Sequence, residues 1–197
     1  MALAARLRLR RGRDGERGAA AVEAALILPL LIVLLFGIFE VALLVNDNLL
    51  LSQAARSAVR TAVALPRDPG FDAEAATAAS GVLGVDTSGD IEQLIIYRAD
   101  PATGRPAGGG SAVDCFTDCI RYTWSPTAER FERVAGTTWD ASTQMACGGR
   151  DATDFVGVEI RGRHEWATGV FGDGVQLVER AVMRLEPVLA GSCGRSV

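Results

Sequence analysis

Glu23 is the first residue whose type and position suggest chemistry, because a charged side chain stands there at the start of a long apolar run. Residues 24–39 carry no charge. A carboxylate among lipid tails costs about 3 kcal/mol at the bilayer centre and less near its edge, so such an acid is a candidate for pairing with a cation. The structural alternative is that Glu23 lies in the first turn of a helix, where the helix dipole favours a carboxylate that stays in water.

The element that positions Glu23 is the apolar stretch of residues 19–45. A helix rises about 1.5 Å per residue, so this stretch is long enough to cross a hydrocarbon core of about 30 Å. A core helix of a soluble protein would show a polar face over that length, and none is present between Glu23 and Glu40. We therefore predict a transmembrane helix at about residues 24–45, with an extracytoplasmic extension that ends near residue 65.

Residues 1–18 form a basic leader that predicts the orientation of this span in the cell membrane. Six arginines there oppose only Asp14 and Glu16, which gives the leader a charge of +4; because the whole chain carries −4, the residues after it carry −8. A basic flank of a single span stays cytoplasmic, so the acidic C-terminal part is expected to be extracytoplasmic. A nucleic-acid-binding patch is the alternative, but the leader has no interleaved aromatic residues and adjoins the span, so we expect no nucleic-acid partner.

The chain offers three candidate cleavage signals around the span. A secretory signal peptide needs a small-x-small triplet just after a short apolar region, and the alanine triplet at residues 62–64 lies far beyond it. Arg10 and Arg11 form a twin-arginine pair, but the residues that follow do not continue that motif. The third signal is a cut before the span, after Gly18, where glycine and Ala19 would supply a flexible and unhindered backbone.

A glycine followed by small residues and a glutamate at the fifth position, directly before a span, resembles the processing site of type IV prepilins. Within that group, residues 18–40 resemble the N-terminus of the TadE-like proteins of tight-adherence (Flp) pilus systems, as do residues 53–56 and, more weakly, residues 184–187. The residues that carry the main resemblance are Gly18, Ala21, Val22, Glu23, Pro29, Leu30, Gly37 and Glu40.

The resemblance implies a function for the residues at the start of the span. In type IV prepilins a membrane aspartyl peptidase removes the cytoplasmic leader, here after Gly18, and the span remains in the mature protein. The carboxylate, here that of Glu23, then meets the new N-terminal amine of a neighbouring subunit, here that of Ala19. The resemblance also implies the partners: a prepilin peptidase, the Tad pilus assembly platform with its secretion ATPase, related minor pilins and membrane lipid. It gives Pro29 a role in packing or membrane extraction, for which a harmless kink is the alternative.

The periodicity after the span predicts an α+β fold: a long N-terminal transmembrane helix (residues 19–65) that extends into an extracytoplasmic head with a small antiparallel sheet (residues 66–197). One side of the helix extension is apolar and is expected to pack in the core or against a partner helix. That side carries Leu51, Ala55, Ala58, Val59, Ala62 and Leu65. In the head we expect a helix at residues 73–82 capped by Asp72, strands at 91–97, 120–124, 155–166 and 175–185, a loop at 98–114, and mostly loop or a short helix at 131–145. Alternation along 155–166 puts Val156, Val158 and Ile160 on one face, and Glu159, Arg161 and Arg163 on the other. An amphipathic helix is the alternative for residues 175–185.

Four cysteines all follow the span, on the side that the predicted orientation makes oxidising, so we predict two disulfides. Of the three connectivities, Cys119–Cys147 with Cys115–Cys193 and Cys115–Cys119 with Cys147–Cys193 are equally plausible. A zinc site needs closely spaced Cys and His pairs, and one C-x-x-x-C with a single histidine, His164, argues against it.

No motif in the sequence places a catalytic nucleophile. His164 could act as a base, but a position on the surface of a strand is the expected one. The chain contains no lysine, which excludes a Schiff-base or phosphate-loop lysine within it. We therefore predict a non-enzymatic protein that needs no cofactor or metal, and the resemblance implies that it is a pseudopilin. The alternatives are an uncleaved, membrane-anchored interaction protein of the cell envelope and, as a third class, an anchored enzyme.

Overall fold

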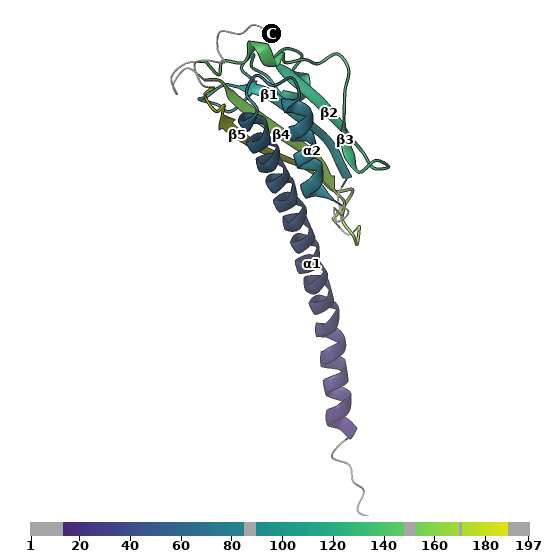
Figure 1. Ribbon diagram of the computed structural model, residues 1–197. Coiled ribbons are helices and arrows are strands. Elements are labelled where there is room, and N and C mark those ends of the chain that lie inside the picture. The colour runs from purple at the N-terminus through teal and green to yellow at the C-terminus, as the bar shows by residue number, and fades with distance from the viewer. Residues whose placement is uncertain (1–13, 85–89, 148–152, 170, 189–197) are drawn as a thin grey trace, which may run out of the picture. The chain divides into compact units, whose positions relative to one another are not determined.

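The computed structural model describes residues 14–84, 90–147, 153–169 and 171–188 (Figure 1). Most of the predicted basic leader, residues 1–13, lies outside this part of the chain, and so does Cys193. The chain divides into two compact units, Met1–Ala42 and Leu43–Val197.

The first unit contains the N-terminal part of helix α1 (Asp14–Ala64), which continues without interruption through Pro29. Among the described residues, α1 is the one helix that is long and apolar enough to cross a membrane. The large apolar side chains of its N-terminal part are exposed, from Val22 to Val41. An apolar helix that its own chain leaves uncovered fits a single-pass membrane anchor.

The second unit is an α+β head built on a five-stranded antiparallel sheet with the order β3-β2-β1-β4-β5 (Figure 1). The strands are β1 (Asp90–Ala99), β2 (Cys119–Ser125), β3 (Arg130–Arg133), β4 (Phe155–His164) and β5 (Val175–Arg184). The predicted α+β fold with a small antiparallel sheet is confirmed. β5 pairs with β4 over its whole length, so the stretch that could have been an amphipathic helix is a strand.

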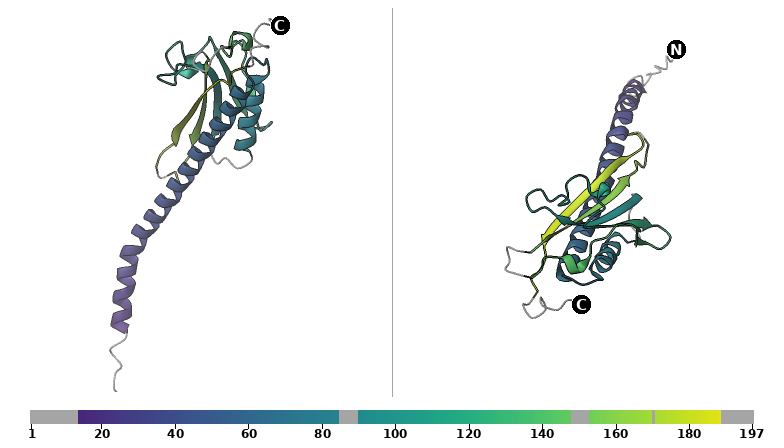
Figure 2. Two further views of the ribbon diagram at one scale, coloured as in Figure 1. Left: turned by 60° about the vertical axis from the view of Figure 1, so that its left-hand side comes forward. Right: turned by 90° about the horizontal axis from the view of Figure 1, so that it is seen from above.

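One face of the sheet is covered by two helices, the part of α1 after residue 43 and α2 (Phe71–Leu83) (Figure 1 and Figure 2). The predicted apolar side of α1 is confirmed from Leu51 to Ala62, and Ala54 and Val63 are buried with it. These side chains form one core cluster with the inward-facing side chains of the sheet. Each fully buried Leu or Ile in that cluster contributes about 2 kcal/mol to folding.

The opposite, outer face of the sheet is partly covered by residues 100–118, which pack against β1. Tyr97 of β1 is fully buried there, and its hydroxyl donates a hydrogen bond to the carbonyl of Gly104 (2.9 Å). Gly157 of β4 makes room for this ring, because a Cβ at that position would lie 2.4 Å from it. Burial of the Tyr97 side chain raises its pKa to about 12, so it stays a hydrogen-bond donor at any physiological pH.

The prediction that Asp72 caps α2 is wrong. The helix begins at Phe71 after Gly70, and no side chain caps it. Asp72 is instead buried, where it accepts a hydrogen bond from the Tyr122 hydroxyl (2.7 Å) and pairs with Arg133 (3.2 Å). Because α2 starts with two residues that face the core, its position is fixed by packing rather than by a capping side chain.

Residues 131–145 are more regular than predicted. They contain most of β3, which pairs with β2 from Arg130 to Arg133, and a 3₁₀ turn at Ala141–Thr143. A strand of four residues buries a single side chain, that of Phe131, so its sequence carries no readable alternation.

Candidate functional site

The predicted processing site lies in the first turns of α1. Gly18, Ala19 and Glu23 are exposed, and a Cβ added at Gly18 would meet no atom within 4 Å. Ala19 and Glu23 are four residues apart, which puts them on one face of the helix, one turn from each other. The bond after Gly18 is sterically open but helical, so a peptidase must unwind it. Glycine makes this easier, because it disfavours a helix by about 1 kcal/mol relative to alanine.

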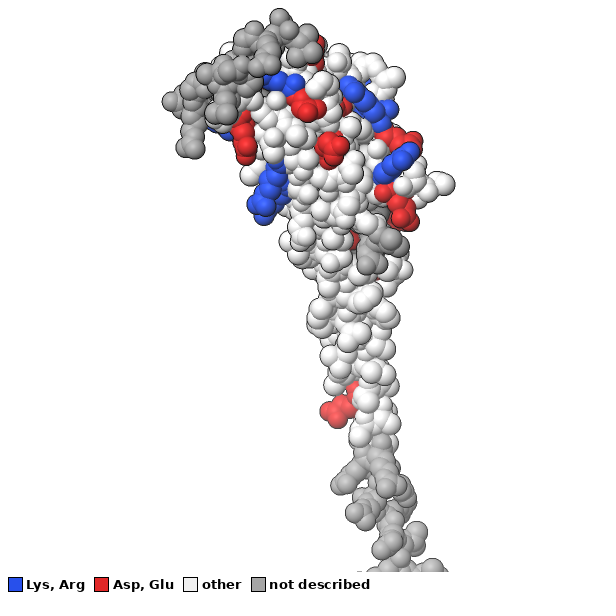
Figure 3. Space-filling model, in the orientation of Figure 1, with Lys and Arg blue, Asp and Glu red and all other residues white. Residues whose placement is uncertain are grey.

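Glu23 has no hydrogen bond or ion pair with any residue that the structure describes. The sixteen residues that follow it carry no charge, and the face of the molecule in Figure 3 is white over most of the helix. Glu40, at the far end of the apolar run, differs from it because its side chain is fully buried. Glu23 is therefore an exposed acid on an apolar rod, where a cation could reach it from outside the chain.

His164 is not on the surface of its strand, so the position expected for it is wrong. Its side chain is 1% exposed at the end of β4, and Nδ1 lies 2.6 Å from a carboxylate oxygen of Asp47 on α1. The ring also packs edge-on against Trp166, with 5.0 Å between the ring centroids. The second ring nitrogen, Nε2, is buried and has no hydrogen-bond partner among the residues that the structure describes. A substrate could not reach this histidine, and the pair instead fastens the helix to the sheet.

Asp47 was not singled out from the sequence, although a signal for it exists. It is the first charged residue after the apolar run, and it lies 4% exposed on the side of α1 that faces the sheet. A charged residue at the start of the buried side of a helix needs a partner of opposite charge. His164, the one histidine of the chain, was a candidate for that partner.

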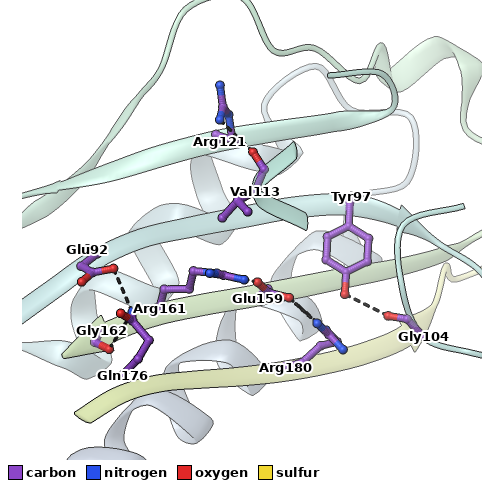
Figure 4. A network of polar contacts seen from close by, with 10 residues as sticks. All are labelled: Glu92, Tyr97, Gly104, Val113, Arg121, Glu159, Arg161, Gly162, Gln176 and Arg180. Atoms are coloured by element: carbon purple, nitrogen blue, oxygen red, sulfur yellow. Dashed lines mark hydrogen bonds and ion pairs between the residues drawn. The ribbon is translucent and has the colours of Figure 1, made fainter. Parts of the chain in front are cut away.

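A second charged cluster lies on the outer face of the sheet (Figure 4). Glu159 of β4 is fully buried, and it accepts a hydrogen bond from Arg161 Nε (2.8 Å) and further bonds from Arg180 of β5, the longer of them at 3.2 Å. Its bonds to Arg180 raise the pKa of that guanidinium above its usual range. Alternation along β4 predicted an outward position for Glu159 but not its burial, which depends on side chains of the neighbouring strands.

Cys115 and Cys119 form a disulfide with their Cα atoms 6.1 Å apart. This pairing excludes the connectivity that joins Cys119 to Cys147. Cys147 is disulfide-bonded too, and Cys193 lies outside the described residues. In the described part of the chain, no group of three or more His, Cys, Asp or Glu side chains could hold a metal ion.

A single exposed apolar helix followed by an α+β head fits the class of single-pass, membrane-anchored proteins. Residues 18–60 match the family model of TadE-like proteins, which confirms the resemblance predicted from the sequence. No curated protein and no solved structure matches the chain. The family match points to a function related to the tight-adherence pilus and to association with its membrane machinery.

Proposed function

We propose that the protein is a non-enzymatic pseudopilin, or minor-pilin-type subunit, that takes part in assembling a tight-adherence pilus. The observation that carries the proposal is Glu23: an acid without a partner in the described chain, on an exposed apolar helix, inside the segment that matches the TadE-like family. An isolated carboxylate in lipid or in a helix bundle destabilises whatever holds it, so a partner cation from outside the chain explains why the residue is tolerated.

The proposed mechanism has three steps. A prepilin peptidase cuts the leader after Gly18, the carboxylate of Glu23 then pairs with the Ala19 amine of a neighbouring subunit, and the head caps or primes the fibre. The pairing brings two opposite charges together in a medium of low dielectric constant, where each offsets the burial of the other. The basic leader and the acidic remainder support an orientation with the leader in the cytoplasm and the head outside.

The experiment that tests the first step is intact-mass spectrometry of the chain co-expressed with a prepilin peptidase. We expect the mature chain to begin at Ala19. Gly18→Val should retain the leader, because a β-branched side chain crowds the scissile bond, whereas Gly15→Val is a matched control that should be processed normally. A wild-type chain that keeps its leader under these conditions would instead identify an uncleaved membrane anchor.

The pairing step has its own direct test, because the chain contains no lysine. Each copy then offers one primary amine, that of its N-terminus, to a carbodiimide that joins amines to nearby carboxylates. In assembled material we expect a cross-link between Ala19 of one subunit and Glu23 of another. Cross-links that reach only acids of the head would contradict the pairing.

A further inference from the structure

β5 forms one edge of the sheet, and this edge is long and regular. All ten of its residues pair with β4 without a bulge, and no strand in the described part of the chain pairs with its other side. Alternate N–H and C=O groups of an edge strand point away from the sheet, where they can pair with an added strand. The opposite edge, β3, offers four residues. The sheet therefore has one edge that is suited to an extended partner.

The outer face next to this edge is basic, although the chain as a whole is acidic. Side chains of β4 and β5 that share the outer face form a group that we call the arginine face: Arg161, Arg163, Arg180 and Arg184. Among the described residues of β4 and β5, Glu159 is the one acid on this face, and it neutralises one of these four charges. Glu92 of β1 lies near the start of β5, where it accepts a hydrogen bond from Gln176 (2.9 Å). Within a chain of net charge −4, such a surface attracts an anionic partner.

Two of these arginines are held in place before any partner arrives. Glu159 contacts Arg161 through Nε alone, and the Arg161 side chain remains 24% exposed, so its terminal nitrogens can donate to another group. Arg180 is 35% exposed and lies nearer the edge (Figure 4). Guanidinium groups that are already oriented lose little conformational entropy when they bind a carboxylate.

We propose that the β5 edge binds an extended acidic segment of another protein by β-strand addition. An added strand presents every second side chain on the outer face, directly beside Val178, Arg180, Val182 and Arg184. The best partner therefore carries two acids four residues apart, opposite Arg180 and Arg184, with an apolar residue midway between them, opposite Val182. Val178 is 41% exposed and extends the apolar contact.

A second copy of this chain is a poorer occupant of the edge. In a symmetric pair of antiparallel β5 strands, side chains that lie directly opposite each other point to the same face of the sheet. One residue near the middle of β5 therefore faces its own copy. In the two registers with the greatest overlap, that residue is either Glu179 or Arg180. Like charges directly opposite each other destabilise a sheet. Charge repulsion thus disfavours a symmetric dimer through β5, whereas it does not oppose the binding of an acidic segment.

The test uses the full chain in uncharged detergent and a fluorescently labelled peptide, VDTVTDV, with binding followed by anisotropy. We expect saturable binding that weakens as salt is added. The basic peptide VKTVTKV should bind at least about tenfold more weakly, because it reverses every charge contact. Arg184→Gln should weaken binding of the acidic peptide about fivefold, and the matched control Arg130→Gln, on β3, should leave it unchanged.

The backbone contribution is tested on the peptide, so that no change to the protein can confuse the result. Peptides methylated at alternate amide nitrogens are made in both frames; one frame removes the N–H groups that face β5 and should abolish binding, and the other should not. Equal binding of the acidic and basic peptides, or indifference to methylation in both frames, would overturn the proposal. Dimerisation of the chain without binding of the acidic peptide would overturn it in favour of self-pairing.

Discussion

Two buried acids of the head and the exposed acid near the start of α1 are placed in opposite ways. In the head, Asp47 and Glu159 are buried, and each has a basic partner on another element of the fold. On the N-terminal part of α1, Glu23 is exposed and has no partner among the described residues. A buried acid with an internal partner serves the fold, whereas an acid without one depends on something outside the chain. The free energy of unfolding should separate the two kinds.

The largest loss of stability is expected from His164→Ala. It leaves Asp47 buried without its imidazole partner, next to a cavity, and should lower the free energy of unfolding by about 3 kcal/mol. Denaturant unfolding of the full chain in detergent, followed by tryptophan fluorescence, measures this change. Glu165→Ala, at the exposed neighbouring residue, is the control and should change stability by less than about 0.5 kcal/mol.

Glu159→Ala should have a smaller effect than His164→Ala. The two arginines that lose their carboxylate, Arg161 and Arg180, are partly exposed and can turn toward water, so we expect a loss of about 2 kcal/mol. Glu132→Ala is a matched control, because Glu132 also has an arginine two residues away on its strand, at 3.7 Å, but both side chains are exposed. That control should lie within about 0.5 kcal/mol of wild type. Equal effects of the two substitutions would show that burial does not set the strength of these pairs.

Asp140 is an intermediate case, since it is exposed but bonded to its own backbone. A hydrogen bond from the Ser142 N–H (2.8 Å) lowers the pKa of this carboxyl below its usual value. The stability that the charged form contributes is therefore present above that usual value, about 3.8, and is lost as pH falls through the lower pKa of the folded state. Asp140→Asn should flatten the acid limb of the stability profile, measured by denaturant unfolding across that pH range. An unchanged acid limb would show that the hydrogen bond from Ser142 to Asp140 does not contribute to stability.

Glu23→Gln should have the smallest effect on folding and the clearest effect on assembly. Without an internal partner to lose, the chain should keep its free energy of unfolding within about 0.5 kcal/mol, insert into membranes and still be processed. Pilus assembly, scored by shearing and immunoblotting of surface fibres, should fail. Glu16→Gln changes an acid within the predicted leader and should assemble normally. Normal assembly by Glu23→Gln would remove the pairing from the mechanism.

The sequence predicted those parts of the structure that depend on local periodicity. The apolar run, the buried side of α1 and the alternation of β4 all follow from side chains a few residues apart, and their positions were predicted correctly. The pairs that stabilise the head were not predicted, because Asp47 and His164 lie 117 residues apart. Contacts of that kind depend on strand order and register, which one sequence does not encode in any local pattern.

The Tyr97–Gly104 hydrogen bond divides the covering loop into two stretches with different tolerance for change. The stretch up to Gly104 is held by its hydrogen bond to Tyr97, whose ring fills the space beside Gly157. Residues inserted in this stretch would displace the Tyr97 ring from that space. Gly108, Gly109 and Gly110, further along, are exposed and have no neighbour within 4 Å of an added Cβ. With the proposed orientation, a short epitope tag placed among these three glycines should leave the fold intact and let antibodies detect the subunit on living cells.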